Sequence, residues 1–261
     1  NYIMSSILFE IKNSIAFITL NRPEKFNAFN REMALAFQGK LDECEKNISV
    51  RCVCVTGAGK AFCAGQDLEE VVDPNGPGME KILSEHYNPI VRRIRNLSKP
   101  VLAIVNGVAA GAGANIALCC DIIIAASSAS FIQAFSKIGL IPDSGGTFML
   151  PRLIGWQKAS AFMMLGDKIN AEEAERTGMI YKFFADDVFE DESKKIAAVL
   201  ADMPTRGLWF TKQALSWSFS HTWTEQLFNE DKLQQRAGET RDFKEGVQAF
   251  LEKRKANFKG E

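Results

Sequence analysis

Short apolar runs alternate with helical segments from residue 7 to about residue 184, and this alternation limits what the chain can fold into more than any other feature. Ile7–Lys12 and Ile15–Leu20 flank the turn-forming pair Asn13-Ser14, which predicts two paired strands. The later runs are separated by helix-length segments, and such spacing implies parallel strands joined by right-handed crossovers. The sequence therefore predicts an α/β core. Its further elements are the helix Arg31–Asn47 and the strands Cys52–Thr56, Val101–Val105, Asp121–Ala126 and Met179–Phe184.

The chain changes character after residue 185. No strand signal follows Asp186, and four helical patterns dominate instead. The linkers around Pro204 and Thr222 are too short for a domain boundary, so we expect a helical C-terminal extension of the same core. Exposed aromatic side chains on it favour packing against a neighbouring subunit. The predicted helices are Phe189–Met203, Thr205–Phe219, Thr222–Gln235 and Phe243–Lys255, and the aromatic residues are Trp209, Trp217, Phe219 and Trp223.

The charge balance of the chain argues against a surface for nucleic acid. The 31 basic and 32 acidic residues give a formal charge of -1, whereas electrostatic binders of nucleic acid or anionic membranes carry an excess of basic residues. With 46% hydrophobic and 24% charged residues, the composition is typical of a soluble globular protein, and no apolar run is long enough to cross a bilayer. We therefore expect neither a nucleic-acid nor a membrane partner.

The cysteines and histidines do not suggest a metal site. The six cysteines form no CxxC pair, and His86 and His221 lie far from them in the sequence. Neither histidine lies in a turn beside a nucleophile, so we expect both at the surface and no Ser–His–Asp chemistry. Cysteines in apolar segments usually act as small core residues. No secretory leader pattern is visible, which makes a reduced, cytoplasmic setting the default expectation.

Two segments rich in small residues follow predicted strands. In Thr56–Leu68 and Asn106–Asn115, small residues at a strand-to-helix turn let backbone N–H groups converge on a negative oxygen. Taken singly, either segment is explained as readily by tight packing of a helix on a strand. A dinucleotide site is not indicated, because Gly107, Gly111 and Gly113 lack the GxGxxG spacing.

A third segment, Gly139–Thr147, places an acidic residue in an apolar turn that also contains proline and glycine. Asp143 in this turn either caps the following helix or acts as a poised base. Capping is the commoner reason for such a pattern, so the turn alone does not decide between the two roles.

Together these segments resemble the crotonase superfamily, also called the enoyl-CoA hydratase/isomerase family, over essentially the full chain. The resemblance implies the crotonase (ClpP/crotonase-like) fold, with a parallel-sheet ββα spiral core in residues 1–185 and a helical C-terminal trimerisation region in residues 186–261. It also implies a homotrimer or a hexamer. The matching stretches are Asn21–Ala28, Phe62–Leu68, Lys99–Val101, Asn106–Gly113, Cys120–Ile122 and Ile141–Thr147.

The resemblance also implies how the small-residue segments are used. Members of the family bind a coenzyme A thioester with its carbonyl between two backbone N–H groups, here those of Gln66 and Ala112, with Gly113 as the neighbouring candidate. Such an oxyanion hole stabilises the enolate that forms when an α-proton leaves. Coenzyme A enters as part of the substrate, and neither a metal nor a redox cofactor is expected. The residues expected to contact coenzyme A are Lys25, Ala28, Ala64 and Asp67, with Lys253 reaching in from an adjacent subunit.

Two positions depart from the hydratases of the family. Hydratases carry glutamates where this chain has Asn115 and Phe135, which cannot titrate and are expected to border the acyl group. Asp143 stands where hydratases commonly have glycine, and members with a single carboxylate are typically isomerases. We therefore expect Asp143 to be the base, with Phe135 and Ile141 making its surroundings apolar and raising its pKa.

The sequence constrains the acyl group of the substrate less than it constrains the type of reaction. Three stretches resemble the branch of the family that isomerises ring-1,2-epoxyphenylacetyl-CoA to an oxepin in phenylacetate degradation, and this branch is similar in mechanism to Δ3,Δ2-enoyl-CoA isomerases. Two alternatives stay open, namely an enoyl-CoA hydratase and a non-catalytic relative that binds coenzyme A or RNA. The three stretches are Gly107–Ala114, Ala134–Thr147 and Glu245–Arg254.

Overall fold

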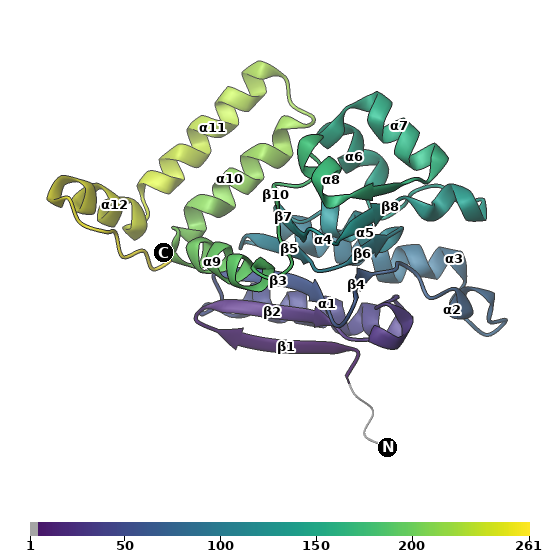
Figure 1. Ribbon diagram of the computed structural model, residues 1–261. Coiled ribbons are helices and arrows are strands. Elements are labelled where there is room, and N and C mark those ends of the chain that lie inside the picture. The colour runs from purple at the N-terminus through teal and green to yellow at the C-terminus, as the bar shows by residue number, and fades with distance from the viewer. Residues whose placement is uncertain (1–4) are drawn as a thin grey trace.

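Two β-sheets form the core of the protein, whose computed structural model describes residues 5–261 (Figure 1). The larger sheet has the order β1-β2-β3-β5-β7-β10, and each neighbouring pair except β1 and β2 is parallel. The smaller sheet has the order β4-β6-β8-β9, with β9 antiparallel to β8. The strands are β1 (Ile7–Lys12), β2 (Ile15–Leu20), β3 (Cys52–Gly57), β4 (Ala61–Cys63), β5 (Val101–Val105), β6 (Val108–Ala110), β7 (Ile122–Ala126), β8 (Ser130–Ile132), β9 (Lys168–Asn170) and β10 (Lys182–Phe184).

The hairpin at the edge of the larger sheet follows directly from the sequence. Ile7–Lys12 and Ile15–Leu20 pair antiparallel within their predicted bounds. Asn13 and Ser14 join them with φ angles of 51° and 62°, the left-handed conformation that a two-residue hairpin turn requires. Val101–Val105 also forms a strand within its predicted bounds. These predictions of local structure are confirmed.

The last predicted strand is shorter than the sequence suggests. β10 begins at Lys182 and not at Met179, because Met179 and Ile180 are used elsewhere. Their backbone N–H groups donate to the Ala174 carbonyl in the helix α8 (Ala171–Arg176), and their side chains are buried in the core. Burial in the core accounts for their apolar character, which in the sequence resembles a continuation of the strand.

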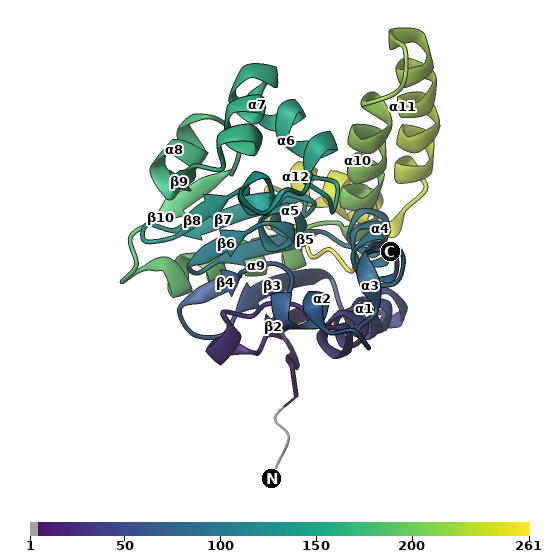
Figure 2. The same ribbon diagram turned by 90° about the vertical axis from the view of Figure 1, so that its right-hand side faces the viewer.

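The core repeats one structural unit three times. β3 leads to β4, β5 leads to β6 and β7 leads to β8, and each pair is followed by a helical segment. Figure 2 shows β4, β6 and β8 side by side, next to the strands that precede them. This arrangement confirms the predicted parallel ββα core. No sequence pattern predicts the smaller sheet, because strands of three residues are too short to show a period.

Helices cover both sheets. α1 (Arg31–Lys46) begins after Asn30, whose side chain accepts a hydrogen bond from the Met33 N–H, and it buries Met33, Phe37 and Leu41 as its spacing predicts. Within residues 5–261 no helix is both long and apolar enough to cross a membrane. The other helices before residue 185 are η1 (Pro23–Lys25), α2 (Leu68–Val72), α3 (Gly78–Lys81), the π-helix η2 (Ile82–Tyr87), α4 (Asn88–Asn96), α5 (Ala112–Leu118), η3 (Ala134–Ile138), α6 (Gly146–Ile154), α7 (Trp156–Leu165) and α8 (Ala171–Arg176).

The C-terminal helices differ in what they cover. α9 (Phe189–Asp202) packs on the larger sheet of its own chain. In Figure 1, α10 (Thr205–Ser218), α11 (Trp223–Gly238) and α12 (Arg241–Glu252) extend away from the sheets, and together we call them the arm. α10 and α11 pack against each other along the arm. The helices within the predicted C-terminal region therefore split into one that completes the core and three that project from it.

The arm exposes much of its apolar surface. Trp217, Phe219 and Trp223 are exposed, as the sequence predicts, whereas Trp209 is half-buried. Trp223 exposes 78% of its surface, which is an unusual fraction for a large aromatic residue. An apolar surface of this kind is typical of a region that contacts another protein molecule.

A buried ion pair joins the first helix of the arm to the core. The Lys212 ammonium lies 2.8 Å from the Asp121 carboxylate and donates to the Ile94 carbonyl, also at 2.8 Å. Only 6% of the Lys212 side chain and 17% of the Asp121 side chain are exposed. Burial lowers the pKa of Lys212 from its ordinary value, and the nearby Asp121 charge opposes that shift. The two buried charges therefore stabilise each other, and their contact helps to fix α10 against the core.

Lys212→Ala should lower the free energy of unfolding by about 3 kcal/mol, because it takes the nearest cation from the buried Asp121 carboxylate and leaves it with the Val101 N–H at 2.8 Å and the more distant Arg95 guanidinium at 3.6 Å. Chemical denaturation followed by circular dichroism measures the loss. Lys194→Ala is the matched control, since Lys194 pairs with Glu190 on the exposed face of α9 and its removal should leave the midpoint unchanged. Equal midpoints for the wild type and Lys212→Ala would contradict a stabilising role for the buried pair.

Candidate active site

The two segments rich in small residues meet beside the smaller sheet. β4 and β6 are parallel neighbours, so the turns that follow them lie side by side. Gly65 has a φ of 93°, and a Cβ atom there would lie 3.0 Å from the Ala110 carbonyl oxygen and 3.3 Å from the Ala112 nitrogen. A Cβ atom on Gly113 would lie 2.4 Å from the Cys63 carbonyl oxygen. Glycine at both positions therefore allows the two backbones to approach each other.

Two backbone N–H groups without partners flank this contact. Within residues 5–261, neither the Gln66 N–H nor the Ala112 N–H has a hydrogen-bond acceptor. Phe29 holds the Gln66 backbone on both sides, since its N–H donates to the Gly65 carbonyl at 2.7 Å and its carbonyl accepts from the Asp67 N–H at 2.8 Å. Ala112 is the first residue of α5, where N–H groups have no partner within the helix. Two fixed donors of this kind are what an oxyanion hole needs.

Asp143 lies in the turn between η3 and α6. Its carboxyl group is half-buried, and burial raises its pKa above the ordinary value, while a hydrogen bond of 2.8 Å from the Ser144 hydroxyl opposes the shift. The expectation that Ile141 shields this group is wrong, because Ile141 exposes 80% of its surface. Residues 136–141 are all exposed, so they do not account for the burial of Asp143.

Asn115 and Phe135, the two positions that depart from the predicted hydratase pattern, lie near Ala112 and the Asp143 turn. Asn115 is fully buried in α5, and its side-chain amide donates to the Asp143 carbonyl at 2.9 Å. Phe135 is buried as well, and its ring lies 3.7 Å from the position that a Cβ atom on Gly111 would take, one residue before Ala112. An amide and an aromatic ring, neither of which can titrate, therefore lie near the start of α5.

Tyr87 is a residue of this region that no sequence motif marks. Its hydroxyl donates to the Gln66 side-chain oxygen at 2.9 Å. Burial raises the pKa of Tyr87 well above its ordinary value, and the charges of Cys63 and Asp143 act in the same direction. The phenol therefore stays neutral. Its only signal in the sequence is a polar aromatic residue within a helical pattern.

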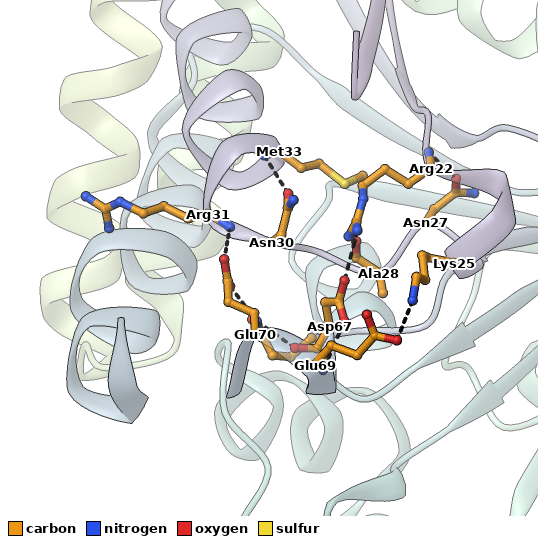
Figure 3. A network of polar contacts seen from close by, with 11 residues as sticks. Arg22, Lys25, Asn27, Ala28, Asn30, Arg31, Met33, Asp67, Glu69 and Glu70 are labelled. Carbon is orange, nitrogen blue, oxygen red and sulfur yellow. Dashed lines mark hydrogen bonds and ion pairs between the residues drawn. The ribbon is translucent and has the colours of Figure 1, made fainter. Parts of the chain in front are cut away.

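Charged side chains fix the residues predicted to contact coenzyme A (Figure 3). Arg22 lies 2.8 Å from the Asp67 carboxylate and donates to the Ala28 carbonyl at 2.5 Å. Lys25 lies 2.6 Å from the Glu69 carboxylate, and this hydrogen bond raises the pKa of Lys25. The Asp67 carboxylate also accepts from the Glu69 N–H at the start of α2. Lys25, Ala28 and Asp67 are thus brought together, although Asp67 is engaged by Arg22 and by α2.

The other two predicted contacts lie far apart in one chain. Ala64 is exposed beside this network, where its N–H donates to the Phe26 carbonyl at 2.9 Å. Lys253 follows α12 with a φ of 56°, and in Figure 1 α12 lies on the opposite side of the molecule from α2. A contact between Lys253 and a ligand bound near Ala64 would therefore require a second chain.

The expectation that both histidines lie at the surface is wrong. His86 is fully buried in η2, where its Nε2 atom lies 3.2 Å from a guanidinium nitrogen of Arg31. A π-helical turn shifts side chains away from the 3.6-residue spacing, so periodicity could not place His86. His221 is half-buried, with its Nδ1 atom 3.0 Å from the Asn229 side-chain nitrogen.

The cysteines behave as the sequence suggests. All six are buried and free, as small core residues are. In the part of the chain that the structure describes, no group of three or more His, Cys, Asp or Glu side chains is placed to hold a metal ion. That the chain needs neither a metal nor a redox cofactor stays a prediction.

Comparison with known proteins gives consistent matches over the whole chain. Residues 10–261 match the family model described as enoyl-CoA hydratase/isomerase. The chain is 46% identical over 260 residues to the 1,2-epoxyphenylacetyl-CoA isomerase of Escherichia coli strain K12, covering 98% of this chain and 99% of that protein. It is 44% identical over 255 residues to a probable enoyl-CoA hydratase of Rhodobacter capsulatus, with 98% of each covered. The crystal structure of an enoyl-CoA hydratase/isomerase from Mycobacterium abscessus superposes with a TM-score of 0.91 at 35% identity, covering 97% of this chain and 98% of that one.

Two glycine substitutions in helices should have opposite effects on stability. Gly113→Ala should lower the free energy of unfolding by about 1–3 kcal/mol, because its Cβ atom would overlap the Cys63 carbonyl oxygen. Gly39→Ala is the matched control in α1, where a Cβ atom meets nothing within 4 Å, and it should raise stability by about 0.5–1 kcal/mol. Thermal unfolding of both variants measures the difference. If Gly113→Ala were as stable as Gly39→Ala, the two backbones would not be in the close contact described.

Proposed function

The chain belongs to the enoyl-CoA hydratase/isomerase family, and we propose that it isomerises an acyl-CoA thioester with Asp143 as the single carboxylate base. The proposal is supported by the hydrogen bond that joins Asn115, in the helix that begins at Ala112, to the Asp143 carbonyl, and by Asn115 and Phe135, which cannot titrate at the two positions where the family resemblance implies glutamates in hydratases. The similarity to the 1,2-epoxyphenylacetyl-CoA isomerase supports ring-1,2-epoxyphenylacetyl-CoA as the substrate, with oxepin-CoA as the product. A Δ3,Δ2-enoyl-CoA is the other isomerase substrate that fits one base.

In the proposed reaction the thioester carbonyl oxygen accepts hydrogen bonds from the Gln66 and Ala112 N–H groups. As an α-proton moves to Asp143, negative charge develops on that oxygen, and the two donors stabilise it. A single donor of this type is worth roughly 2.7–4 kcal/mol in the transition state of other enzymes. Both donors are backbone groups held by strand pairing and by a helix start, so they need not reorganise as the charge forms.

The burial of Asp143 suits a group that takes a proton and returns it. Burial disfavours the carboxylate and raises its pKa, which brings the base closer to the pH at which it operates. After accepting the proton, the same carboxyl group acts as an acid and delivers the proton to a different carbon, or assists opening of the epoxide ring. The product is an isomer of the substrate, so no water, metal or redox partner enters the balance.

Coenzyme A would lie along the residues around η1 and α2. We propose that Lys25, Ala28, Ala64 and Asp67 border the coenzyme, since the charged network in Figure 3 holds this surface in one shape. Lys253 would reach the coenzyme of a neighbouring subunit. Neither a metal nor a redox cofactor belongs to the proposed site.

A hydratase is the second candidate, because a relative at 44% identity is named a probable enoyl-CoA hydratase. Water addition uses two carboxylates that activate one water molecule and exchange its protons with the substrate. The buried amide of Asn115 and the ring of Phe135 cannot do this. Isomerase chemistry with one base is therefore the better supported of the two.

Asp143→Asn keeps the shape of the side chain and removes the base, so isomerase turnover should fall by about 10²–10⁴-fold. The measurement is turnover of a panel of coenzyme A thioesters, including the 1,2-epoxide and 3-enoyl substrates, followed by mass spectrometry. Binding of a substrate thioester, measured by calorimetry, should change little. If Asp143→Asn turned over substrate at the wild-type rate, another group would be the base.

The pH profile gives an independent check on the same residue. Only the deprotonated carboxylate accepts a proton, so wild-type turnover should rise with pH through the raised pKa of Asp143 and then level off. This acid limb should be missing from the residual activity of Asp143→Asn. Steep salt-dependent RNA binding without affinity for coenzyme A thioesters would instead support the non-catalytic alternative.

We also expect the protein to form a trimer or a hexamer in solution. The exposed apolar side chains of the arm, among them Trp223, Phe228 and Phe250, would be covered by a neighbouring subunit. Multi-angle light scattering at micromolar concentration measures the mass of the assembly. A monomer under these conditions would overturn the proposed assembly and with it the contribution of Lys253.

A further inference from the structure

Both polar atoms of the Asn115 side-chain amide have hydrogen-bond partners inside the protein. None of its surface is exposed. Its amide nitrogen donates to the Asp143 carbonyl oxygen at 2.9 Å, and its amide oxygen accepts from the Gln133 side-chain nitrogen at 2.7 Å. Gln133 is itself buried, with 4% of its surface exposed. The two hydrogen bonds leave Asn115 a single orientation, in which its donor faces the Asp143 turn.

The start of α6 leaves space for this amide because residue 146 has no side chain. A Cβ atom on Gly146 would lie 2.3 Å from the Asn115 amide nitrogen and 2.6 Å from its oxygen. The Gly146 N–H also donates to the Asp143 carbonyl, at 2.8 Å. The Asp143 carbonyl therefore accepts two hydrogen bonds, one from the backbone of its own turn and one from α5.

A second contact from α5 holds the neighbouring residue of the turn. The Cys119 thiol, four residues after Asn115 on the same face of the helix, donates to the Ser144 carbonyl at 3.4 Å. Ser144 has a φ of 51°, an unfavourable angle for a residue with a side chain, and its hydroxyl donates to the Asp143 carboxylate at 2.8 Å. α5 thus holds the turn at two points, and the turn in that shape directs one hydrogen bond at the carboxylate.

We propose that Asn115 is a positioning residue for the base, and that the carboxylate at Asp143 requires an amide at this place in α5. An ionised carboxylate has only acceptors, so a side chain of that kind could not donate to the Asp143 carbonyl and would repel it. The inference rests on the proposed function, since it assigns to Asn115 the task of holding the group that reacts.

Few other groups that titrate face the turn. Tyr87 lies in η2, where burial keeps its pKa well above the ordinary value, and the charge of Asp143 acts in the same direction. Cys119 approaches from α5, and burial raises the pKa of its thiol to about 12. Both groups are neutral between pH 5 and pH 9, so a new pH dependence introduced at position 115 would belong to the residue placed there.

Asn115→Asp tests the proposal because it changes a donor into a group that donates only when protonated. Full burial should raise the pKa of the new carboxyl group. Turnover by Asn115→Asp should therefore fall as the pH rises through that pKa, in a range where wild-type turnover has levelled off. Asn115→Ala should lower kcat by about 10²-fold at every pH, the usual effect of a misplacement of about 1 Å, with KM nearly unchanged. The control is Asn170→Asp at the exposed start of α8, where an aspartate caps as well as an asparagine and both kcat and the pH profile should stay as in the wild type.

The possible results separate this inference from the proposed function. If Asp143→Asn is inactive while Asn115→Ala and Asn115→Asp keep the wild-type kcat and pH profile, the positioning role is wrong and the base assignment stands. If Asp143→Asn is fully active, the proposed function itself fails. If Asn115→Ala and Gln133→Leu lose thioester binding in calorimetry as well as turnover, Asn115 is needed for the folded pocket as a whole, and the specific role proposed here is overturned.

Discussion

The contact between the turns after β4 and β6 is the constraint on which the rest of the site depends. Gly65 and Gly113 have no side chain where the two backbones approach, and a Cβ atom at either position would meet backbone atoms of the other turn or strand. The contact fixes the N–H groups of Gln66 and Ala112, which lack acceptors within residues 5–261. Because these donors belong to the backbone, their positions follow from sheet pairing and from the start of α5 and do not depend on a rotamer.

The groups that hold the Asp143 turn are neutral, whereas the charged side chains near this contact gather around Asp67 and Glu70. The Asn115 amide donates to the Asp143 backbone carbonyl, the Ser144 hydroxyl donates to the Asp143 carboxylate, and the buried phenol of Tyr87 stays neutral. Neutral hydrogen-bond donors fix a carboxylate without supplying a full opposite charge, which would lower its pKa and weaken it as a base. Burial can then raise the pKa of Asp143 while the turn stays rigid.

The arm depends on a different balance of forces. α10 is attached to the core through the buried pair of Lys212 and Asp121, whereas much of the apolar surface of the arm is left uncovered. An ion pair orients a helix well but stabilises it less than apolar burial does, because both charges must be desolvated. Burial of the exposed aromatic side chains, including Trp223 and Phe250, against a second chain would stabilise such an arm more than the contacts within one chain do.

The local elements follow from the sequence, because each depends on neighbours along the chain. The hairpin turn at Asn13-Ser14, the α1 spacing and the strand Val101–Val105 depend on turn preferences and on a period of two or 3.6 residues, and they lie where the sequence predicts them. Residues in short or irregular elements do not lie where the sequence predicts them. The smaller sheet has strands too short for any period, Met179 and Ile180 are apolar for burial and not for pairing, and the π-helical turn buries His86 against the expectation from sequence.

In the candidate site, too, some features can be predicted from the sequence and others are decided only by the tertiary structure. The chemical types at Gln66, Ala112, Asn115 and Asp143 can be recognised in the sequence by their resemblance to a family. Which atoms meet is decided only by tertiary structure, since the hydrogen bond between Asn115 and the Asp143 carbonyl joins residues 28 positions apart. Tyr87 reaches Gln66 from an element that no motif marks. A sequence determines which groups are available, and the packing of separate elements determines the distances between them, because those distances arise from contacts that are not local in the chain.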